Sequence, residues 1–325
     1  KKYTYFSYLI EFCSFIGNIW QHELPVDATN SEYTLIDYEV NIDDGGWRLW
    51  KVSVPTVDIE SHRVMATDLI IPTVDTVRHL KVLEAWLGLH CPVILCGPPG
   101  SGKSMTLTSV LNSMPNFMLA PLNFSSGTTP ELILKTFQQY CEYRSGRDGM
   151  TLSPSAPGKW LIIFCDEINL PENDSYGTQR VITFLRQLTE KKGFWKEETN
   201  EWVTIQRIQF VGACNPPTDP GRVVMSNRWL RHAPILFVDF PSPTSLNQIY
   251  GTFSRGLLKL QPSLRSYSDS LTDAMVEMYV ENRTRFKPTA QPHYIYSPRE
   301  LSRWVRALYK AMKEMADMKL EDLVR

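Results

Sequence analysis

The feature that most constrains the fold is the stretch GPPGSGKS at residues 97–104, which matches the spacing G-x-x-x-x-G-K-[ST] in full. The short apolar run PVILC (92–96) precedes it and is typical of a buried strand, while the apolar positions of residues 104–114 recur at helical spacing. Such a loop needs both elements, because they fix where its backbone N–H groups point. The order strand, loop, helix therefore predicts an α/β fold with a parallel sheet.

The residue types within this loop predict a phosphate-binding site. Gly97, Gly100 and Gly102 would let the backbone turn tightly, so that N–H groups face phosphate oxygens. The helix N-terminus would add partial positive charge. Lys103 would reach the β- and γ-phosphates of a nucleotide, and the Ser104 hydroxyl would ligate Mg²⁺. A glycine-rich turn with a chance Lys-Ser pair is the alternative, which the flanking strand and helix disfavour.

A second apolar strand, within LIIFCDEINLP (161–171), ends on two adjacent carboxylates, Asp166 and Glu167. In a sheet of this type that strand end lies beside the phosphates. We therefore expect Asp166 to hold the Mg²⁺ shell and Glu167 to orient and polarise an attacking water. Adjacent side chains on a strand point to opposite faces, so the strand must end at this pair. The alternative is an acidic strand end that faces solvent.

Asn215 follows a third apolar strand, IQFVGAC (208–214), and precedes Pro216 and Pro217. A polar side chain at this strand end could hold the attacking water or the γ-phosphate. It could equally do no more than cap the turn that the two prolines begin. The residues themselves leave both interpretations open.

The stretch SPREL (297–301) predicts the start of a helix, with Ser297 and Glu300 as a capping box and Pro298 at the first helical position. Arg299 then lies in the first turn, where the helix dipole disfavours a cation. A nearby nucleotide phosphate would compensate, whereas a simple surface arginine is the alternative. The expected core face of this helix consists of Leu301, Trp304, Val305 and Leu308.

The chain divides into three regions: residues 1–65, 66–240 and 241–325. The first opens with an apolar run at 3–20, which Glu11 and Asn18 interrupt. We expect this run to be an amphipathic helix packed on another surface and not a membrane span. The middle region alternates short apolar runs with helical patterns, and the last reads almost wholly helical. Because the chain begins with Lys1, we expect a fragment of a longer protein.

Two local features of the middle region can be predicted. Residues 175–193 follow a helical pattern, and Gly193 suits a C-terminal cap. The stretches GFWK (193–196) and WVTI (202–205) flank a polar segment and predict a β-hairpin.

The composition indicates which kinds of ligand the chain is not built to bind. Lys plus Arg total 34 and Asp plus Glu total 35, so a net charge of −1 gives no sign of a nucleic-acid binder that works by bulk charge. The six cysteines form no CxxC pair, and no histidine lies at zinc-ligand spacing from them. We expect reduced, mostly buried cysteines, a reducing compartment, and no metal held by them.

Taken together, the loop, the acidic strand end, the polar strand tip and the helical region with an arginine resemble the AAA+ ATPase plan. More closely, the chain resembles the third AAA+ module of the cytoplasmic dynein heavy chain family, over roughly residues 66–312. The stretches that carry this resemblance include PTVDTVRH (72–79), CGPPGSGKS (96–104), LNFSSGTTPELILKTF (122–137), FCDEINLPENDSYGTQRVITFLRQL (164–188), VGACNPPTDPGR (211–222), RWLRHAPI (228–235), QIYGTF (248–253) and HYIYSPRELSRWVRALY (293–309).

The resemblance implies a P-loop fold with a large parallel-sheet subdomain at 66–240 and a helical lid at 241–325, which ends before the family's lid does. Residues 1–65 look like the junction from the preceding module. It implies binding of ATP or ADP with Mg²⁺, and Asn215 and Arg299 would be the two sensors. Thr73 and Thr76 would border the adenine. The remaining nucleotide contacts would come from Gly97, Pro98, Pro99, Gly100, Ser101, Gly102, Lys103, Ser104 and Met105.

The resemblance also implies a regulatory ATPase site in a ring of six modules that walks on microtubules. Arg231, or less favourably Arg228, resembles an arginine finger that would act in trans on the preceding module. This chain's own finger would come from the following module, so hydrolysis by the chain alone should be slow.

The implied partners are the neighbouring modules, dynein subunits and regulators. Microtubules would be contacted only through another part of the full protein, in the cytoplasm and on the cytoskeleton. We expect a monomer that binds neither nucleic acid nor membrane. The alternatives are a module that holds ADP and rarely hydrolyses, and an AAA+ loader or helicase on nucleic acid, which the neutral charge disfavours.

Overall fold

The computed structural model describes residue 15, residue 33 and residues 35–41, 43–66, 69–147, 149–291 and 293–315. The apolar run predicted as a helix at 3–20 lies outside the described residues apart from Phe15, and Cys13 lies outside them as well. Among the helices within these ranges, none is long and apolar enough to cross a membrane.

A five-stranded, wholly parallel sheet forms the centre of the large body, as the alternating apolar runs predict. Its order is β11 (Ile235–Phe237), β3 (Val93–Cys96), β10 (Ile208–Cys214), β7 (Trp160–Asp166) and β4 (Phe117–Asn123). Ala213 pairs with Asp166, and Cys214 pairs with Cys96. Because these strands run in parallel and end in register, the residues that follow β3, β7 and β10 meet at one edge of the sheet.

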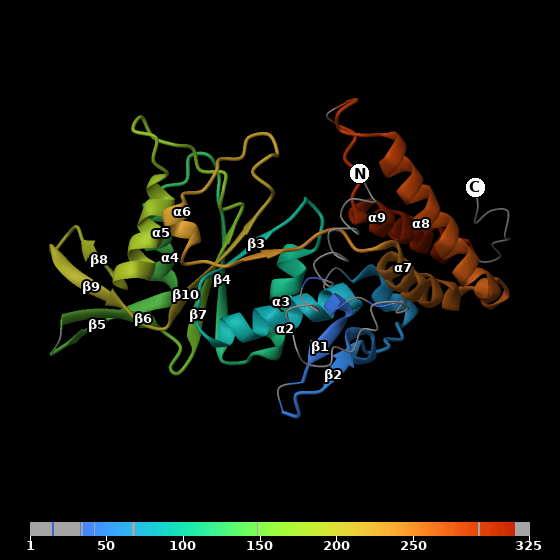
Figure 1. Cartoon of the computed structure of the whole chain (residues 1–325), viewed down its shortest axis with the longest axis horizontal. Coiled ribbons are helices and arrows are strands. Elements are labelled where there is room, and N and C mark those ends of the chain that lie inside the picture. Colours follow the sequence, from blue (N-terminus) through green and yellow to red (C-terminus); the bar gives the residue numbers. More distant parts are fainter. Residues whose placement is uncertain are drawn as a thin grey trace.

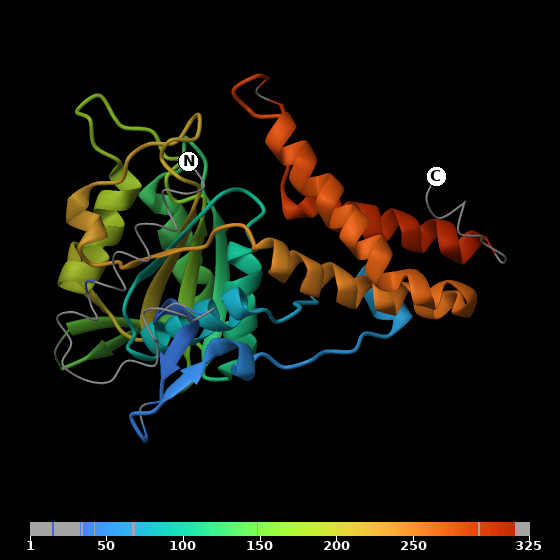
Figure 2. The same cartoon turned by 45° about the vertical axis from the view of Figure 1, so that its right-hand side comes forward.

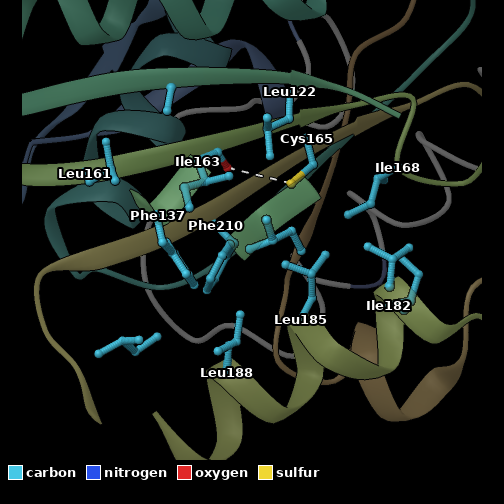
Figure 3. Close-up of a cluster of buried hydrophobic side chains, with 14 of the residues drawn as sticks. Leu122, Phe137, Leu161, Ile163, Cys165, Ile168, Ile182, Leu185, Leu188 and Phe210 are labelled. Atoms are coloured by element: carbon cyan, nitrogen blue, oxygen red, sulfur yellow. Dashed lines mark hydrogen bonds between the residues drawn. The ribbon is translucent and has the colours of Figure 1, made fainter. Parts of the chain in front are cut away.

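Helices cover both faces of this sheet, so its strands read as continuous apolar runs. In Figure 1, α2 (Val74–Gly88) and α3 (Lys103–Ser113) lie on one face, and α4 (Pro130–Tyr140) and α5 (Arg180–Lys191) lie on the other. Figure 3 shows the hydrophobic core on the α4 and α5 face, in which Ile163 and Phe210 from the strands face Leu185 and Leu188 of α5. This three-layer packing fixes the sheet edge that carries the site.

A second, smaller sheet extends from the α4 and α5 side of the body. Its order is β5 (Cys141–Gly146), β6 (Gly149–Pro154), β9 (Glu201–Ile205) and β8 (Gly193–Lys196). Strands β8 and β9 pair antiparallel, which confirms the predicted hairpin.

Helix α5 is shorter than predicted and is capped differently. It begins at Arg180 because Asp174 accepts hydrogen bonds from the Tyr176 and Thr178 backbone N–H groups, which closes a turn ahead of the helix. Lys192, with φ 49°, ends the helix, so the prediction that Gly193 is the cap is wrong. Gly193 instead begins β8, where a Cβ would lie 2.5 Å from the Val203 carbonyl oxygen.

The C-terminal region is helical, as predicted. After α6 (Asn227–Leu230) and β11 come α7 (Pro243–Leu257), α8 (Ser268–Arg285) and α9 (Pro298–Glu314), with the 3₁₀ turns η4 (Leu258–Leu260) and η5 (Pro262–Tyr267). In Figure 2 these lid helices stand beside the sheet-containing body. Ile59, Val64 and Ile71 pack into the lid core with residues of α7, α8 and α9. The segment that precedes α2 therefore helps to build the lid.

The remaining elements precede that segment and lie against the large body. They are η1 (Leu35–Asp37), β1 (Tyr38–Val40), β2 (Trp47–Leu49) and η2 (Trp50–Ser53). The turn η3 (Ser61–Met65) carries Val64 and belongs to the segment that packs in the lid core. Strands β1 and β2 form an antiparallel pair, and Lys81 and Arg78 of α2 form ion pairs with Glu39 and Asp37.

The start of α9 differs from the prediction in two respects. Pro298 occupies the first turn as expected, but the Ser297 side chain makes no capping hydrogen bond, so the predicted capping box does not form. Ser297 is instead packed against the glycine-rich loop, where a Cβ on Gly100 would lie 2.9 Å from Ser297 Oγ. Trp304 is 37% exposed and does not belong to the core face, which Leu301 and Val305 form together with partly buried Leu308.

The cysteines follow the prediction in part. Cys141, Cys165 and Cys214 are buried and Cys96 is half-buried, whereas Cys91 is exposed. All five are free thiols.

Candidate functional site

The glycine-rich loop lies between β3 and α3, in the setting that the sequence predicts. Gly100 (φ 83°) and Gly102 (φ 94°) occupy the left-handed region that favours glycine, and Gly102 is the N-cap of α3. Gly97 has a different reason to be glycine. A Cβ there would lie 2.0 Å from the Val238 carbonyl oxygen, so its role is close packing and not a tight turn.

Lys103 folds back over this loop. Its Nζ donates to the carbonyl oxygens of Gly97 (2.8 Å) and Pro98 (3.1 Å) and to Asn215 Oδ1 (3.2 Å). Partial burial lowers the pKa of Lys103, and the nearby Glu167 carboxylate opposes that shift. The ammonium group therefore lies at the centre of the loop, where it could exchange these acceptors for phosphate oxygens.

The acidic pair lies at the end of β7, as predicted. Glu167 has φ 58°, which breaks the strand alternation and lets both carboxylates line one cavity. Asp166 Oδ1 accepts a hydrogen bond from the Glu167 backbone N–H at 3.0 Å. The Glu167 carboxylate also forms an ion pair with Arg222, a residue that the sequence reasoning did not single out.

Asn215 follows β10 and is 7% exposed. Its side chain accepts from Lys103, and its backbone carbonyl accepts from Asn169 Nδ2 at 2.9 Å. The buried Asn169, which the sequence reasoning also passed over, thus joins the loops that follow β7 and β10.

A cavity of about 580 Å³ brings the predicted site residues together, within the size range of ligand pockets. Its polar end includes residues 99–105, Asp166, Glu167 and Asn215. Its apolar wall comes from the segment before α2 and from α7: Val64, Leu69, Ile70, Ile71, Ile249 and Phe253. A charged end and an apolar wall suit the phosphates and the base of a nucleotide.

The two threonines proposed to border the adenine have different places. Thr76 lines the cavity, but Thr73 does not. Thr73 is the N-cap of α2, where it and Thr76 form a reciprocal capping box. This box is hard to predict from the sequence, because threonine replaces the usual Glu or Gln at its third helical position.

Helix α9 presents three arginines to the cavity. Arg299, Arg303 and Arg306 lie at spacings of four and three residues, so they share one helix face. Arg303 forms an ion pair with Glu300, and Arg299 makes no ion pair with any residue in the described ranges. Only Arg299 was predicted, because the other two appeared as ordinary surface positions of an amphipathic helix.

The candidate arginine fingers lie away from this cavity. Arg231 is 62% exposed and pairs with Glu190 of α5 at 2.7 Å, and Arg228 is exposed on α6. Neither lines the cavity. Their position therefore does not favour action on a nucleotide in this cavity.

The side chains at the polar end of the cavity could bind Mg²⁺ only together with a nucleotide, which would supply further ligands. Within the described part of the chain, no group of three or more His, Cys, Asp or Glu side chains could hold a metal ion. Ser104 and Asp166 both line the cavity, so phosphate oxygens and waters would have to complete an octahedral shell. The Ser101 hydroxyl in the loop is buried and has no hydrogen-bonding partner among the described residues, so it offers one further polar contact.

Comparison with known proteins gives a consistent result. Residues 59–241 match the family described as P-loop containing dynein motor region, and residues 253–325 match the dynein heavy chain ATPase lid domain. The cytoplasmic dynein heavy chain of Dictyostelium discoideum is 62% identical over 315 residues, which cover 97% of this chain and 7% of that protein. That of Drosophila melanogaster is 57% identical over 291 residues, 90% of this chain and 6% of that protein.

The chain therefore spans a small part of these relatives, and the part that it spans contains both the glycine-rich loop and the lid. The fold, the loop and the family matches agree, and the chain belongs to the dynein heavy chain family, in which it forms an AAA+ P-loop motor module with its helical lid.

Proposed function

We propose that this chain binds Mg-ATP in the 580 Å³ cavity and hydrolyses it. The observation that carries the proposal is the convergence of Lys103, the Asp166–Glu167 pair and Asn215 at one end of that cavity, with Arg299 facing them from the lid. These groups come from three strand ends and one lid helix. An arrangement of this kind supplies the positioning and charge stabilisation on which phosphoryl transfer depends.

In this proposal the loop N–H groups and Lys103 bind the phosphates. Ser104 and Asp166 would hold a Mg²⁺ ion, which would supply positive charge beside the phosphates. Glu167 accepts a hydrogen bond from the attacking water and orients it toward the γ-phosphorus. Asn215 contacts that water or the γ-phosphate, and Arg299 compensates phosphate charge from the lid.

We assign the chain to the third module of a cytoplasmic dynein heavy chain, where its nucleotide state would regulate microtubule-based movement. Support comes from the quoted stretches between residues 72 and 309 and from relatives named cytoplasmic dynein heavy chain. The proposed partners are the neighbouring modules, other dynein subunits and regulators, with microtubules bound elsewhere in the full protein. The proposed location is the cytoplasm and its cytoskeleton.

Arg231 would act as a finger on the preceding module, and the finger for this chain's site would come from the following one. Exposure of Arg231 outside the cavity supports this assignment. An arginine finger accounts for about 10³–10⁵ in rate, so this chain alone should hydrolyse ATP slowly.

A module that holds ADP with little turnover is the second candidate. The ion pair between Glu167 and Arg222 favours it, because a carboxylate oxygen that a guanidinium already contacts is not free to accept a hydrogen bond from water.

Comparison of wild type with Glu167→Gln separates the two candidates. Amide in place of carboxylate keeps the size of the side chain but removes the base. The hydrolysis proposal predicts that phosphate release from Mg-ATP falls about 10²-fold or more in the variant, with the affinity for ADP little changed. Equally slow phosphate release from both proteins would instead support the ADP-holding module.

A further inference from the structure

Arg222 contacts the carboxylate of the proposed catalytic base, and the roles assigned above leave this contact unexplained. Its Nη1 forms an ion pair with Glu167 Oε2. Apart from this contact, Arg222 Nη1, Arg222 Nε and Glu167 Oε2 have no hydrogen-bonding partner in the described part of the chain. The two charges therefore depend on each other.

The loop that carries Arg222 is built to hold it there. Gly221 has φ 74°, and the Arg222 backbone N–H donates to the Asp219 carbonyl at 3.3 Å. The next residue, Val223, donates to the Asn169 carbonyl at 2.9 Å. Since Asn169 also donates to Asn215, the loop that follows β10 is tied to the turn that contains Glu167.

Burial makes the ion pair stronger than a surface contact. The side chain of Arg222 is 13% exposed and that of Glu167 is 35% exposed. A partly buried pair is screened less by salt and water than an exposed one. Because arginine stays protonated, Arg222 presents a permanent positive charge to the carboxylate.

This charge has a chemical consequence. A general base must accept a hydrogen bond, and then a proton, from water. The Arg222 guanidinium occupies the acceptor oxygen that a water would use. In the pose observed here, Glu167 is restrained.

We propose that Arg222 is a positioning residue that holds Glu167 in a resting pose and limits hydrolysis until the carboxylate leaves it. The ion pair itself is independent of the function proposed above, and its effect on hydrolysis rests on that function. No covalent step involves Arg222. Its role is to set how often Glu167 is available to the water.

The first test measures the ion pair without nucleotide. The midpoint of thermal unfolding is compared for wild type, Arg222→Gln, Glu167→Gln and the double variant. If the ion pair stabilises the fold, each single substitution should lower the unfolding midpoint. The double substitution should then lower it by less than the sum of the two single shifts. Additive shifts would overturn the proposal. Arg180→Gln removes a 71% exposed arginine paired with Asp174 and serves as the matched control.

The second test measures hydrolysis in a single turnover. Without Arg222, the Glu167 carboxylate should be free to accept from the attacking water more often, so Arg222→Gln should raise the hydrolysis rate about threefold or more. The dissociation constant of a fluorescent ATP analogue should stay unchanged within about twofold. Arg222→Lys keeps the charge and should stay near wild type. In the Glu167→Gln background, Arg222→Gln should have no effect on the rate.

The outcomes separate the two proposals. A rate that is unchanged or lower in Arg222→Gln, in a folded protein that binds the analogue, overturns the restraint. A wild-type protein that fails to bind the analogue contradicts the proposed function, while the unfolding comparison still decides whether the pair exists. Circular dichroism of each variant, with Arg222→Lys as the conservative case, distinguishes lost restraint from lost folding.

Discussion

At the residue scale, Gly97 illustrates how a neighbouring segment can dictate a residue type. A Cβ at this position would meet the Val238 carbonyl oxygen at 2.0 Å, and backbone oxygen cannot move aside as a flexible side chain can. We predict that Gly97→Ala lowers the free energy of unfolding by about 1–3 kcal/mol through overpacking. Denaturant unfolding followed by tryptophan fluorescence would measure it.

Gly127→Ala is the matched control for this change. A Cβ at Gly127 would have nothing within 4 Å, so the control should change stability little. Equal stabilities for the two variants would show that the loop and the Val238 segment separate easily, which contradicts the packing described here.

The site residues that could be predicted share one property: they are defined by spacing along the chain. Lys103 and Ser104 follow from the loop pattern, and Asp166 and Glu167 follow from the end of an apolar strand. Arg222 could not be found in this way, because its contact with Glu167 depends on how two loops fold over each other. Asn169 was missed for the same reason.

At the scale of elements, the strands and helices predicted within the described residues are present, and the errors of prediction lie at their ends. The SPRE pattern predicts a capping box at α9, but packing against Gly100 takes Ser297 out of capping range. Helix α5 starts late because the Asp174 turn competes for its first residues. Local patterns predict elements well, while their termini respond to tertiary contacts that spacing does not encode.

Tyr250 links two lid helices, and its removal tests how the lid is held. Its buried hydroxyl, on α7, donates to the Pro298 carbonyl at 2.6 Å and lies 3.0 Å from Ser302 Oγ on α9. We predict that Tyr250→Phe lowers the free energy of unfolding by about 1 kcal/mol, the typical worth of one buried hydrogen bond. Chemical denaturation would measure this change.

The control is Tyr176→Phe, since Tyr176 is 87% exposed. If Tyr250→Phe were as stable as this control, the Tyr250 hydrogen bond would contribute nothing to stability. Helix α9 would then be held by its apolar face alone.

At the scale of the whole molecule, the cavity exists because two bodies meet. The loop and the strand ends supply its polar end, while Val64, Ala66, residues 69–71 and the lid helices supply most of the rest. The approach of Ser297 to Gly100 places the arginine face of α9 opposite the loop. A nucleotide in this cavity would therefore touch both bodies, and its binding would bias their relative position.

Substitution of Arg299 tests whether the lid contributes to nucleotide binding in this cavity. Arg299 makes no ion pair with a described residue, so a phosphate could bind it without displacing an existing partner. We predict that Arg299→Ala weakens Mg-ATP binding about tenfold or more, as expected for a lost charge-assisted hydrogen bond. Fluorescence titration with a labelled nucleotide would measure the dissociation constant.

Arg285→Ala provides the comparison, because Arg285 is 70% exposed and pairs with Glu281 on α8. A dissociation constant that is the same for both variants would place the phosphates away from Arg299.

The measurement that tests the central claim most directly is calorimetric titration of this chain with Mg-ATP and Mg-ADP, beside Lys103→Ala. Lys135→Ala, on the exposed side of α4, controls for the loss of a lysine. Release of nucleotide on heat denaturation should first be assayed, so that a site already filled is recognised and emptied. The account predicts that wild type and Lys135→Ala bind with one-to-one stoichiometry and that Lys103→Ala does not. Equal binding by all three proteins, or by none once the site is empty, would contradict it.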